Sequence, residues 1–550
     1  MEFELHPLQH ADGRSHFRLR GNTKISSCSA LIQDWLEECL EGHTVCATQD
    51  KREFYQTRLL EIGVSSERHP KRVRLVHSDD VALHEPYVTL SHCWGGSNIL
   101  KLQRDNIDRL SASISSTELP KTFIDAIEVA RFLQVRYIWI DSLCIIQDSK
   151  EDWEKEAALM SDVYQNAFLN IGATASSNSH GGLFYDRNPE LLRPCVVTYA
   201  REKYELRYPE LWEHGINEAP LNKRAWVVQE RWLCPRMLHF GREQVFWECC
   251  KLVACEVYSR GPPYSFVLRD TIYHGFKQVK PHSDQNHGEG AAEAQLASAW
   301  GAIVLQYSSS NLTFHSDKLI ALSGMATQMQ RAIKSEYLAG LWKGLGVIAQ
   351  LDWRVFNGYH EVTSSRPDEY TAPSWSWASV NGAVTITSQQ RLRAYRDKYC
   401  ELSILQEYHI DLTSTNATGQ VTGGYLRIRG PVHAITLKEE PPATNLEDPY
   451  EAFRVSAYPW QLCLDGVALR RFSVYLDVPL HNGGAFFGLA LYSWNNGGDP
   501  EAVGLLLEEI SNSPIRFRRV GILVLNGERE VMWFSSGTLN YPQGFSIVIV

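Results

Sequence analysis

The alternation of hydrophobic and polar positions is sharpest in the first third of the chain. Tyr87–Ser91 is a β-rich run that stops at a polar segment with paired glycines. After Pro120, a residue tolerated in the first turn of a helix, Phe123 and Ile127 recur at helical spacing. Tyr137–Ile140 is an unbroken apolar run of the kind that is buried in a parallel sheet. This order of strand, helix and strand predicts a βαβ unit.

Polar side chains follow both predicted strands. If the strands are parallel neighbours, their carboxyl ends share one sheet edge, and open α/β sheets bind ligands at that edge. We therefore expect the two groups of side chains to lie together. They are Ser91, His92, Cys93, Trp94 and Gly95 after the first strand, and Asp141 and Ser142 after the second.

The next predicted helix carries an unexpected acid. Ser149, with Asp152 three residues later, is a variant of the capping box that begins helices. Trp153 and Met160 belong to an apolar stripe on this helix, and Glu156 lies beside or within it. A carboxylate at such a position requires a specific explanation.

The remaining pattern predicts an α/β protein with a β-rich C-terminal domain. We expect a strand at 168–171, a helix at 224–233, strands at 237–240 and 244–247, a flexible loop near 279–293, and helices at 317–333 and 337–349. Short β-like runs dominate from about residue 389. The predicted domains are 1–86, which packs on the core, 87–250, the mostly helical segment 251–388, and 389–550.

Composition excludes several classes of protein. With 550 residues and 44% hydrophobic residues, the chain is long enough for two to four structural units. A net charge of -10 argues against nucleic-acid binding, which needs clustered Lys and Arg. No window reaches the roughly 18 apolar residues of a membrane span, and we read no signal peptide. The 12 cysteines are scattered, which favours reduced thiols and a cytoplasmic location.

Cysteine and histidine spacing suggests zinc at one place only. Cys39, His43 and Cys46 have a usable spacing, but a structural site needs a fourth ligand, and the sequence places none. A helix-end packing cluster is the alternative. Cys249 and Cys250 lack a paired metal spacing and are expected in the core. The sequence therefore assigns no metal site.

Several stretches together resemble the heterokaryon-incompatibility (HET) domain of filamentous fungi. They occur in the family's order, and segments 317–324, 339–342 and 372–378 resemble the C-terminal extensions of these proteins. The matching stretches are 87–95 (YVTLSHCWG), 119–127, 137–148 (YIWIDSLCIIQD), 153–167, 182–184 (GLF) and 224–231 (RAWVVQER).

The resemblance implies a role in fungal non-self recognition, or allorecognition, and in programmed cell death. It also implies a fold distantly similar to Toll/interleukin-receptor (TIR) domains: a TIR-like or flavodoxin-like, mostly parallel sheet with helical elaborations. Some TIR domains hydrolyse NAD with a helix-borne glutamate that follows a tryptophan, and Trp153 and Glu156 fit that pattern here. By this fold-level analogy NAD is a candidate substrate, and no cofactor is expected.

Two acids have both a functional and a structural interpretation. A partly desolvated Glu156 would stabilise an oxocarbenium-like ribosyl transition state as nicotinamide leaves. Alternatively, Glu156 is a buried structural acid that hydrogen-bonds the backbone at a strand end or pairs with an arginine such as Arg224 or Arg231. Asp141 is either an acceptor for a ligand ribose or an acid that fixes the loop.

A thiol nucleophile with a histidine base is the other chemistry that the segment suggests. His92 and Cys93 are adjacent, so on a strand they point to opposite faces, which argues against a direct pair. Core and salt-bridge roles are the alternative for Trp226, Glu230 and Arg231. The catalytic candidates are Glu156, Asp141, Cys93, Ser91 and His92, and the substrate-binding candidates are Trp94, Gly95, Ser142, Trp153, Arg224, Trp226, Glu230 and Arg231.

Three classes of function remain open from the sequence. The first is a HET-domain effector that cleaves NAD. The second is a HET-fold biosynthetic enzyme, a hydrolase, cyclase or transferase, that acts on a small metabolite. The third is a non-enzymatic death-signalling module that self-associates. The expected partners are accordingly a nucleotide or metabolite and a second copy of the chain.

Overall fold

The computed structural model describes residues 4–7, 19–47, 56–63, 72–81, 85–96, 98–193, 195–208, 210–262, 289–356, 364–386, 398–414, 416–439, 460–469, 471–480, 482–495, 498–512, 514–536 and 545–550. The chain divides into two compact units, Met1–Lys280 and Pro281–Val550. The finer boundaries that the sequence suggests, at 86, 250 and 388, stay predictions.

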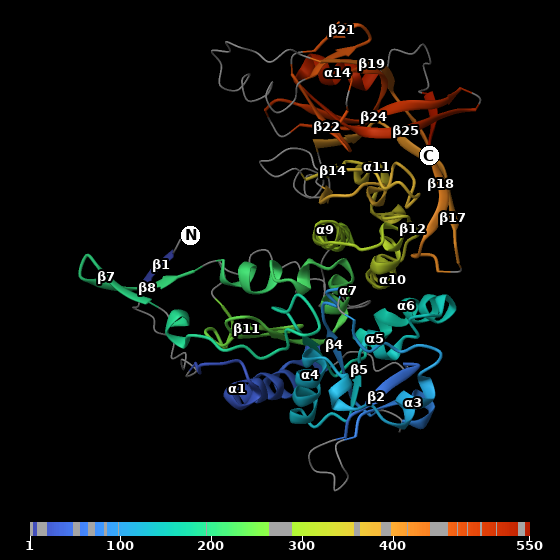
Figure 1. The fold of residues 1–550 in the computed structure, drawn as a ribbon. Helices are drawn as coiled ribbons and strands as arrows, with labels where there is room; N and C mark the ends of the chain where they lie inside the picture. Colours follow the sequence, from blue (N-terminus) through green and yellow to red (C-terminus); the bar gives the residue numbers. More distant parts are fainter. Residues whose placement is uncertain are drawn as a thin grey trace. The chain divides into compact units, whose positions relative to one another are not determined.

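The first unit is built on a mixed sheet of eight described strands (Figure 1). Its four inner strands run parallel, and the strands at both ends are antiparallel. In spatial order the strands are β11 (Val253–Cys255), β10 (Val245–Cys249), β9 (Arg236–Phe240), β6 (Leu169–Gly172), β4 (Tyr87–Ser91), β5 (Tyr137–Trp139), β2 (Arg58–Glu61) and β3 (Arg74–His77).

The two strands that the apolar pattern predicts are parallel neighbours. Tyr87 of β4 lies opposite Tyr137 of β5, and Thr89 lies opposite Trp139. Every residue of both strands is buried, as expected for inner strands of a sheet covered on two faces. The predicted α/β class with a mostly parallel core sheet is thus confirmed.

Helices connect and cover these strands. Ser149 caps α6 by accepting a hydrogen bond from the Asp152 amide, and Pro120 stands at the N-cap of α4, so both predicted helix starts are confirmed. α6 packs against α7. The helices of the unit are α1 (Ile25–Glu37), α2 (Thr44–Ala47), α3 (Ile107–Ala112), α4 (Lys121–Phe132), α5 (Asp141–Cys144), α6 (Lys150–Gln165) and α7 (Ala225–Leu233), with single π-helical turns at Glu38–Gly42 and Glu213–Asn217.

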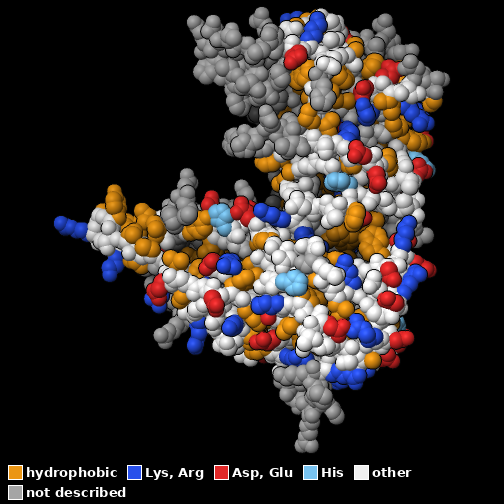
Figure 2. Space-filling model, in the orientation of Figure 1, with side chains coloured by type: hydrophobic (Ala, Val, Ile, Leu, Met, Phe, Trp, Pro, Cys, Tyr) orange, Lys and Arg blue, Asp and Glu red, His pale blue; other side chains and the backbone are white. Residues whose placement is uncertain are grey.

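A small second sheet lies apart from the main one. It pairs β1 (Glu4–Pro7), β8 (Glu202–Arg207) and β7 (Cys195–Tyr199), all antiparallel. Several of its apolar side chains are exposed: Leu5 by 49%, Val196 by 52% and Tyr199 by 68%. Figure 2 shows hydrophobic side chains gathered over this sheet. These residues therefore belong to the surface and not to the core.

The second unit begins with helices, and here one prediction is wrong. α9 (Glu289–Ser308) and α10 (Ile320–Ile333) are helical, but the predicted helix at 337–349 begins instead as the hairpin β12 (Tyr337–Leu338) and β13 (Leu341–Trp342). The turn residues Ala339 and Gly340 have positive φ angles of 42° and 109°, which a right-handed α-helix does not permit. Only the short helix α11 (Val347–Gln350) follows.

The predicted β-rich C-terminal region is confirmed. Its largest sheet contains eleven described strands, joined almost entirely in antiparallel pairs. They are β16 (Tyr399–Glu401), β17 (Ile404–Leu412), β18 (Val421–Gly430), β19 (Val432–Glu439), β20 (Trp460–Leu464), β21 (Val467–Ala468), β22 (Phe472–Leu476), β23 (Gly484–Trp494), β24 (Glu501–Asn512), β25 (Ile515–Asn526) and β26 (Phe545–Ile549); helix α14 (Glu528–Ser536) and the pair β14 (Trp353–Val355) and β15 (Val384–Ile386) complete the unit.

Two further expectations concern the chain between the units and a membrane. Of the loop expected near 279–293, residues 279–288 lie outside the described residues, and Glu289 begins α9. Among the described helices, none combines the length and the hydropathy that crossing a bilayer requires.

Candidate functional site

The carboxyl ends of β4 and β5 bring the predicted polar groups together. The Trp94 indole donates a hydrogen bond to Asp141 Oδ2 over 2.9 Å, and His92 Nδ1 lies 3.8 Å from Asp141 Oδ1. The Ser142 amide donates to the same carboxylate over 2.6 Å. Asp141 therefore fixes the tryptophan-bearing turn to the end of β5, in the way a loop-fixing acid would.

A buried hydrogen-bond group lies at the end of β4. The Ser91 hydroxyl donates to the Glu230 carboxylate and accepts from Asn170 Nδ2 over 2.9 Å. Tyr164 of α6 also hydrogen-bonds Glu230. All four side chains are at most 4% exposed. The Glu230 carboxyl group on α7 is thus bonded from β4 and α6, and Asn170 of β6 supports the group through Ser91 and the Glu230 backbone carbonyl.

The position of Glu230 changes its acidity. Burial raises the pKa of Glu230 to about 7, although the Arg224 charge and the Ser91 hydrogen bond act in the opposite direction. At neutral pH this carboxyl group is therefore divided between its protonated and ionised forms. A group with that property can either stabilise positive charge or exchange a proton.

His92 is buried beside this group, between an aromatic neighbour and charged ones. Its ring meets Phe123 edge to face with 4.9 Å between the ring centroids, and burial lowers the pKa of His92 to about 4. Neither ring nitrogen makes a hydrogen bond of normal geometry to a described residue. At neutral pH His92 is therefore an uncharged imidazole, which fits a packing role or a neutral base.

Cys93 points into a different cluster. It packs with Leu221, Val227 and Met237, and burial raises the pKa of its thiol. His92 and Cys93 therefore face separate surroundings, as expected for adjacent residues. A raised pKa leaves Cys93 as a thiol at neutral pH, and a thiol is a poor nucleophile.

The paired glycines permit the turn that carries Trp94. Gly95 and Gly96 have φ angles of 68° and 65°, in the left-handed region. A Cβ atom on Gly95 would lie 2.2 Å from Asn178 Cβ, so only glycine allows the loop after β6 to approach this closely. Gly95 is thus required by the backbone, and a ligand is not needed to explain it.

Glu156 is held by a separate group of charges. Arg58 Nη2 lies 3.6 Å from Glu156 Oε1 and 2.6 Å from Asp152 Oδ2, and Arg58 Nε donates to the Cys144 carbonyl. Burial raises the pKa of Glu156, partly offset by a hydrogen bond from Thr57. The arginine near Glu156 is therefore Arg58, and its described ion pairs do not include Arg224 or Arg231. Whether Glu156 has a catalytic role stays a prediction.

The remaining candidate site residues are either partly exposed near Ser91 and Glu230 or buried in the core. Arg224 Nη1 donates to the His92 carbonyl, and both Arg224 and Trp94 are half-buried. Trp153 meets Trp226 edge to face at 6.5 Å, which joins α6 to α7. Ser142 is fully buried. Arg224, Trp94 and Asp141, whose side chain is 22% exposed, are therefore partly exposed, and we call these three residues the rim of the group around Ser91 and Glu230.

Arg231 does not belong to this rim, because it forms a buried ion pair with Glu248. It binds both oxygens of Glu248, whose Oε2 lies 3.1 Å from His239 Nε2. Burial alone would raise the pKa of Glu248, but the Arg231 and His239 charges hold it well below its usual value. This group joins α7 to β9 and β10.

Tyr164 and Asn170 were not predicted from the sequence as site residues. Asn170 is the one polar residue of β6, between Leu169 and Ile171, and is fully buried. A polar residue inside an apolar strand is a signal that could have been used, because a buried amide needs partners. The partners themselves, Thr89 and Ser91, are visible only in the structure.

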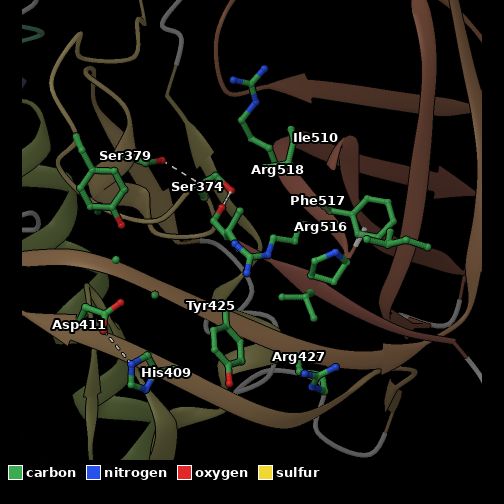
Figure 3. Close-up of a pocket in the computed structure, with 18 of the residues that line it drawn as sticks. Ser374, Ser379, His409, Asp411, Tyr425, Arg427, Ile510, Arg516, Phe517 and Arg518 are labelled. Carbon is green, nitrogen blue, oxygen red and sulfur yellow. Dashed lines mark hydrogen bonds and ion pairs between the residues drawn. The ribbon is translucent and has the colours of Figure 1, made fainter. Parts of the chain in front are cut away.

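The second unit contains a cavity of about 940 Å³ (Figure 3). Its lining includes Arg366, Arg516 and Arg518, together with His409, which hydrogen-bonds Asp411 over 2.9 Å. Arg518 is paired with Glu508 and Arg366 with Asp477. None of these residues was predicted from the sequence, because they come from strands and loops that are distant in the chain.

Comparison with known proteins agrees with the motifs of the first unit. Residues 87–230 match the family model described as "Heterokaryon incompatibility protein (HET)". The chain is 25% identical over 186 residues to "Heterokaryon incompatibility protein 6, OR allele" from Neurospora crassa. That alignment covers 27% of this chain and 27% of the relative. No solved structure matches the chain.

Proposed function

We propose that this protein, whose residues 87–230 form a HET domain, acts in fungal non-self recognition and the cell death that follows it, and that its HET domain cleaves NAD. The first part is supported by the family match and by the name of the Neurospora crassa relative. The second part rests on one observation: the carboxyl group of Glu230, with a pKa of about 7, contacts the residue that ends β4, at the sheet edge where open α/β proteins bind ligands.

Glu230 fits the role better than Glu156. Both are helix-borne glutamates that follow a tryptophan, Trp226 in one case and Trp153 in the other. Glu156 already faces the guanidinium of Arg58, which also binds Asp152. Glu230 instead accepts hydrogen bonds from Ser91 and Tyr164, which orient the carboxyl group without neutralising it. We therefore assign the acid to Glu230.

The proposed chemistry is hydrolysis of the bond between ribose and nicotinamide. Nicotinamide leaves with the bonding electron pair, and positive charge develops on the ribose. The ionised Glu230 carboxylate stabilises that charge, and water adds to the ribose carbon with release of a proton. The partly exposed Arg224 at the rim offers a guanidinium for the diphosphate.

The direct test is nicotinamide release by the purified full chain incubated with NAD. We expect release by the unmodified chain and a loss of about a hundredfold or more in Glu230→Gln, since the amide keeps the shape but not the charge. Light scattering at several protein concentrations checks whether activity requires self-association. Inert protein at every assembly state, with the fold intact, contradicts NAD cleavage.

The alternatives give other outcomes. A non-enzymatic signalling module retains its toxicity when Glu230→Gln is expressed in a fungal host. A biosynthetic enzyme of the same fold releases no nicotinamide and shows a covalent adduct or turnover with a small metabolite. The raised pKa of the Cys93 thiol does not favour a covalent route through that residue.

A further inference from the structure

Four potential metal ligands meet at the junction of the N-terminal helices and the main sheet. They are Cys39, His43, Cys46 and Cys249, and their ligand atoms all lie within 4.8 Å of one another. None of the four residues is more than 4% exposed. The cluster is separate from the group around Ser91 and Glu230.

The distances suit a tetrahedral ion. His43 Nδ1 lies 3.4 Å from Cys249 Sγ and 3.8 Å from Cys46 Sγ. With zinc–sulfur bonds of about 2.3 Å and zinc–nitrogen bonds of about 2.0 Å, the ligand atoms of a tetrahedral site lie roughly 3.5–3.8 Å apart. These two distances therefore match a tetrahedral site, and all four ligand atoms lie within 4.8 Å of one another, so small side-chain movements would complete it.

Local structure explains how three of the ligands come together. Cys39 lies in the π-helical turn Glu38–Gly42, His43 follows it, and Cys46 is in α2. The wider π-helical turn is a feature often found at functional sites. Cys249, the last residue of β10, comes from 206 positions further along the chain than His43.

We propose that Cys39, His43, Cys46 and Cys249 bind one structural zinc ion. Three thiolates and one imidazole are a ligand set that zinc prefers, and four protein ligands leave no open position for catalysis. The complete burial of the set agrees with a structural role.

The surrounding groups are arranged to support thiolate ligands. Arg236 Nε donates to Cys39 Sγ over 3.3 Å, and the Leu252 amide donates to Cys249 Sγ over 3.3 Å. Three thiolates and a divalent ion carry one net negative charge, which the Arg236 guanidinium balances. On the far side of the imidazole, Glu38 Oε1 lies 3.8 Å from His43 Nε2, in position to orient the ring.

The zinc ion would hold the N-terminal segment against the edge of the sheet. α1 already contacts β10 there, since Trp35 stacks on Trp247 with 6.2 Å between the ring centroids. A zinc ion bound by Cys249 of β10 and by the turn after α1 would close a loop of more than two hundred residues. Metal binding is thereby coupled to the folding of the whole first unit.

The test is the zinc content of the reduced full chain, purified without an affinity metal and measured by mass spectrometry. We expect about one zinc per chain, its loss in Cys249→Ala, and no change in Cys28→Ala. Cys28 is an equally buried cysteine on α1 that lies outside the cluster, so it is the matched control.

Cobalt reconstitution provides a measurement that needs no variant. Cobalt(II) in the unmodified chain should give the strong visible bands of a tetrahedral site together with thiolate charge-transfer bands, and zinc should displace it. A reduced chain that holds no zinc after zinc is supplied, or that gives only octahedral cobalt, overturns the proposal. So does a folded Cys249→Ala that retains zinc.

Discussion

The Ser91 hydroxyl donates a hydrogen bond to the carboxylate of Glu230, a residue 139 positions further along the chain. This contact joins the end of β4 to α7 in the interior of the first unit. It places Glu230, and not Glu156, in contact with the residue that ends β4.

The pH dependence of stability should report the raised pKa of Glu230. The folded protein binds this proton more tightly than the unfolded chain, whose glutamate has a pKa near 4.5. The resulting stabilisation is fully present below about pH 4.5 and is lost as the pH rises through about 7. The loss of stability between pH 5.5 and pH 8 is about 2 kcal/mol.

Glu230→Gln should therefore reduce the difference in unfolding free energy between pH 5.5 and pH 8 by about 2 kcal/mol, measured by urea titration. His92, whose pKa is lowered to about 4, destabilises the fold at low pH, but equally in both proteins, so its effect cancels. An unchanged pH difference would show that Glu230 titrates normally.

The two glutamates should differ in activity. In Glu156→Gln, Arg58 keeps its contacts with Asp152 and the Cys144 carbonyl, so nicotinamide release should stay within about threefold of the unmodified rate. Glu230→Gln is the matched substitution and should lose about a hundredfold. The reverse result, loss with Glu156→Gln alone, would return the catalytic role to α6.

Gly95→Ala should destabilise the first unit by about 2–3 kcal/mol, because it combines a positive φ with a clash against Asn178. Gly96→Ala is the control: its φ is also positive, but a Cβ there meets nothing within 4 Å, so about 1 kcal/mol is expected. Denaturant titration of both variants measures the difference. Equal losses would mean that the close approach to Asn178 has no energetic weight.

Arg231→Met should cost about 3–5 kcal/mol of stability, because it leaves the buried Glu248 carboxylate without its guanidinium. The double variant Arg231→Met with Glu248→Gln removes both charges and should recover part of that loss. Thermal and urea unfolding of the four proteins forms a double-mutant cycle. A coupling free energy near zero would contradict a buried ion pair at this position.

Much of the first unit follows from local pattern. The strands β4 and β5, the cap at Ser149 and the glycine turn after Trp94 were predicted because each depends on a few consecutive residues. Neighbouring parallel strands then require Asp141 to lie near the turn. The predicted helix at 337–349 was wrong, because its apolar spacing does not show that Ala339 and Gly340 adopt positive φ angles and form a hairpin turn.

The sequence by itself determined the α/β class, the β-rich C-terminal region, the HET motifs and the edge at which polar residues gather, because periodicity and turn chemistry are encoded in adjacent positions. Only the tertiary structure decided that Ser91 contacts Glu230, that Glu156 faces Arg58, and that Cys249 completes the set begun by Cys39, His43 and Cys46. Those partners are separated by dozens to hundreds of residues. Spacing along the chain carries no information about contacts that arise only when distant elements pack together.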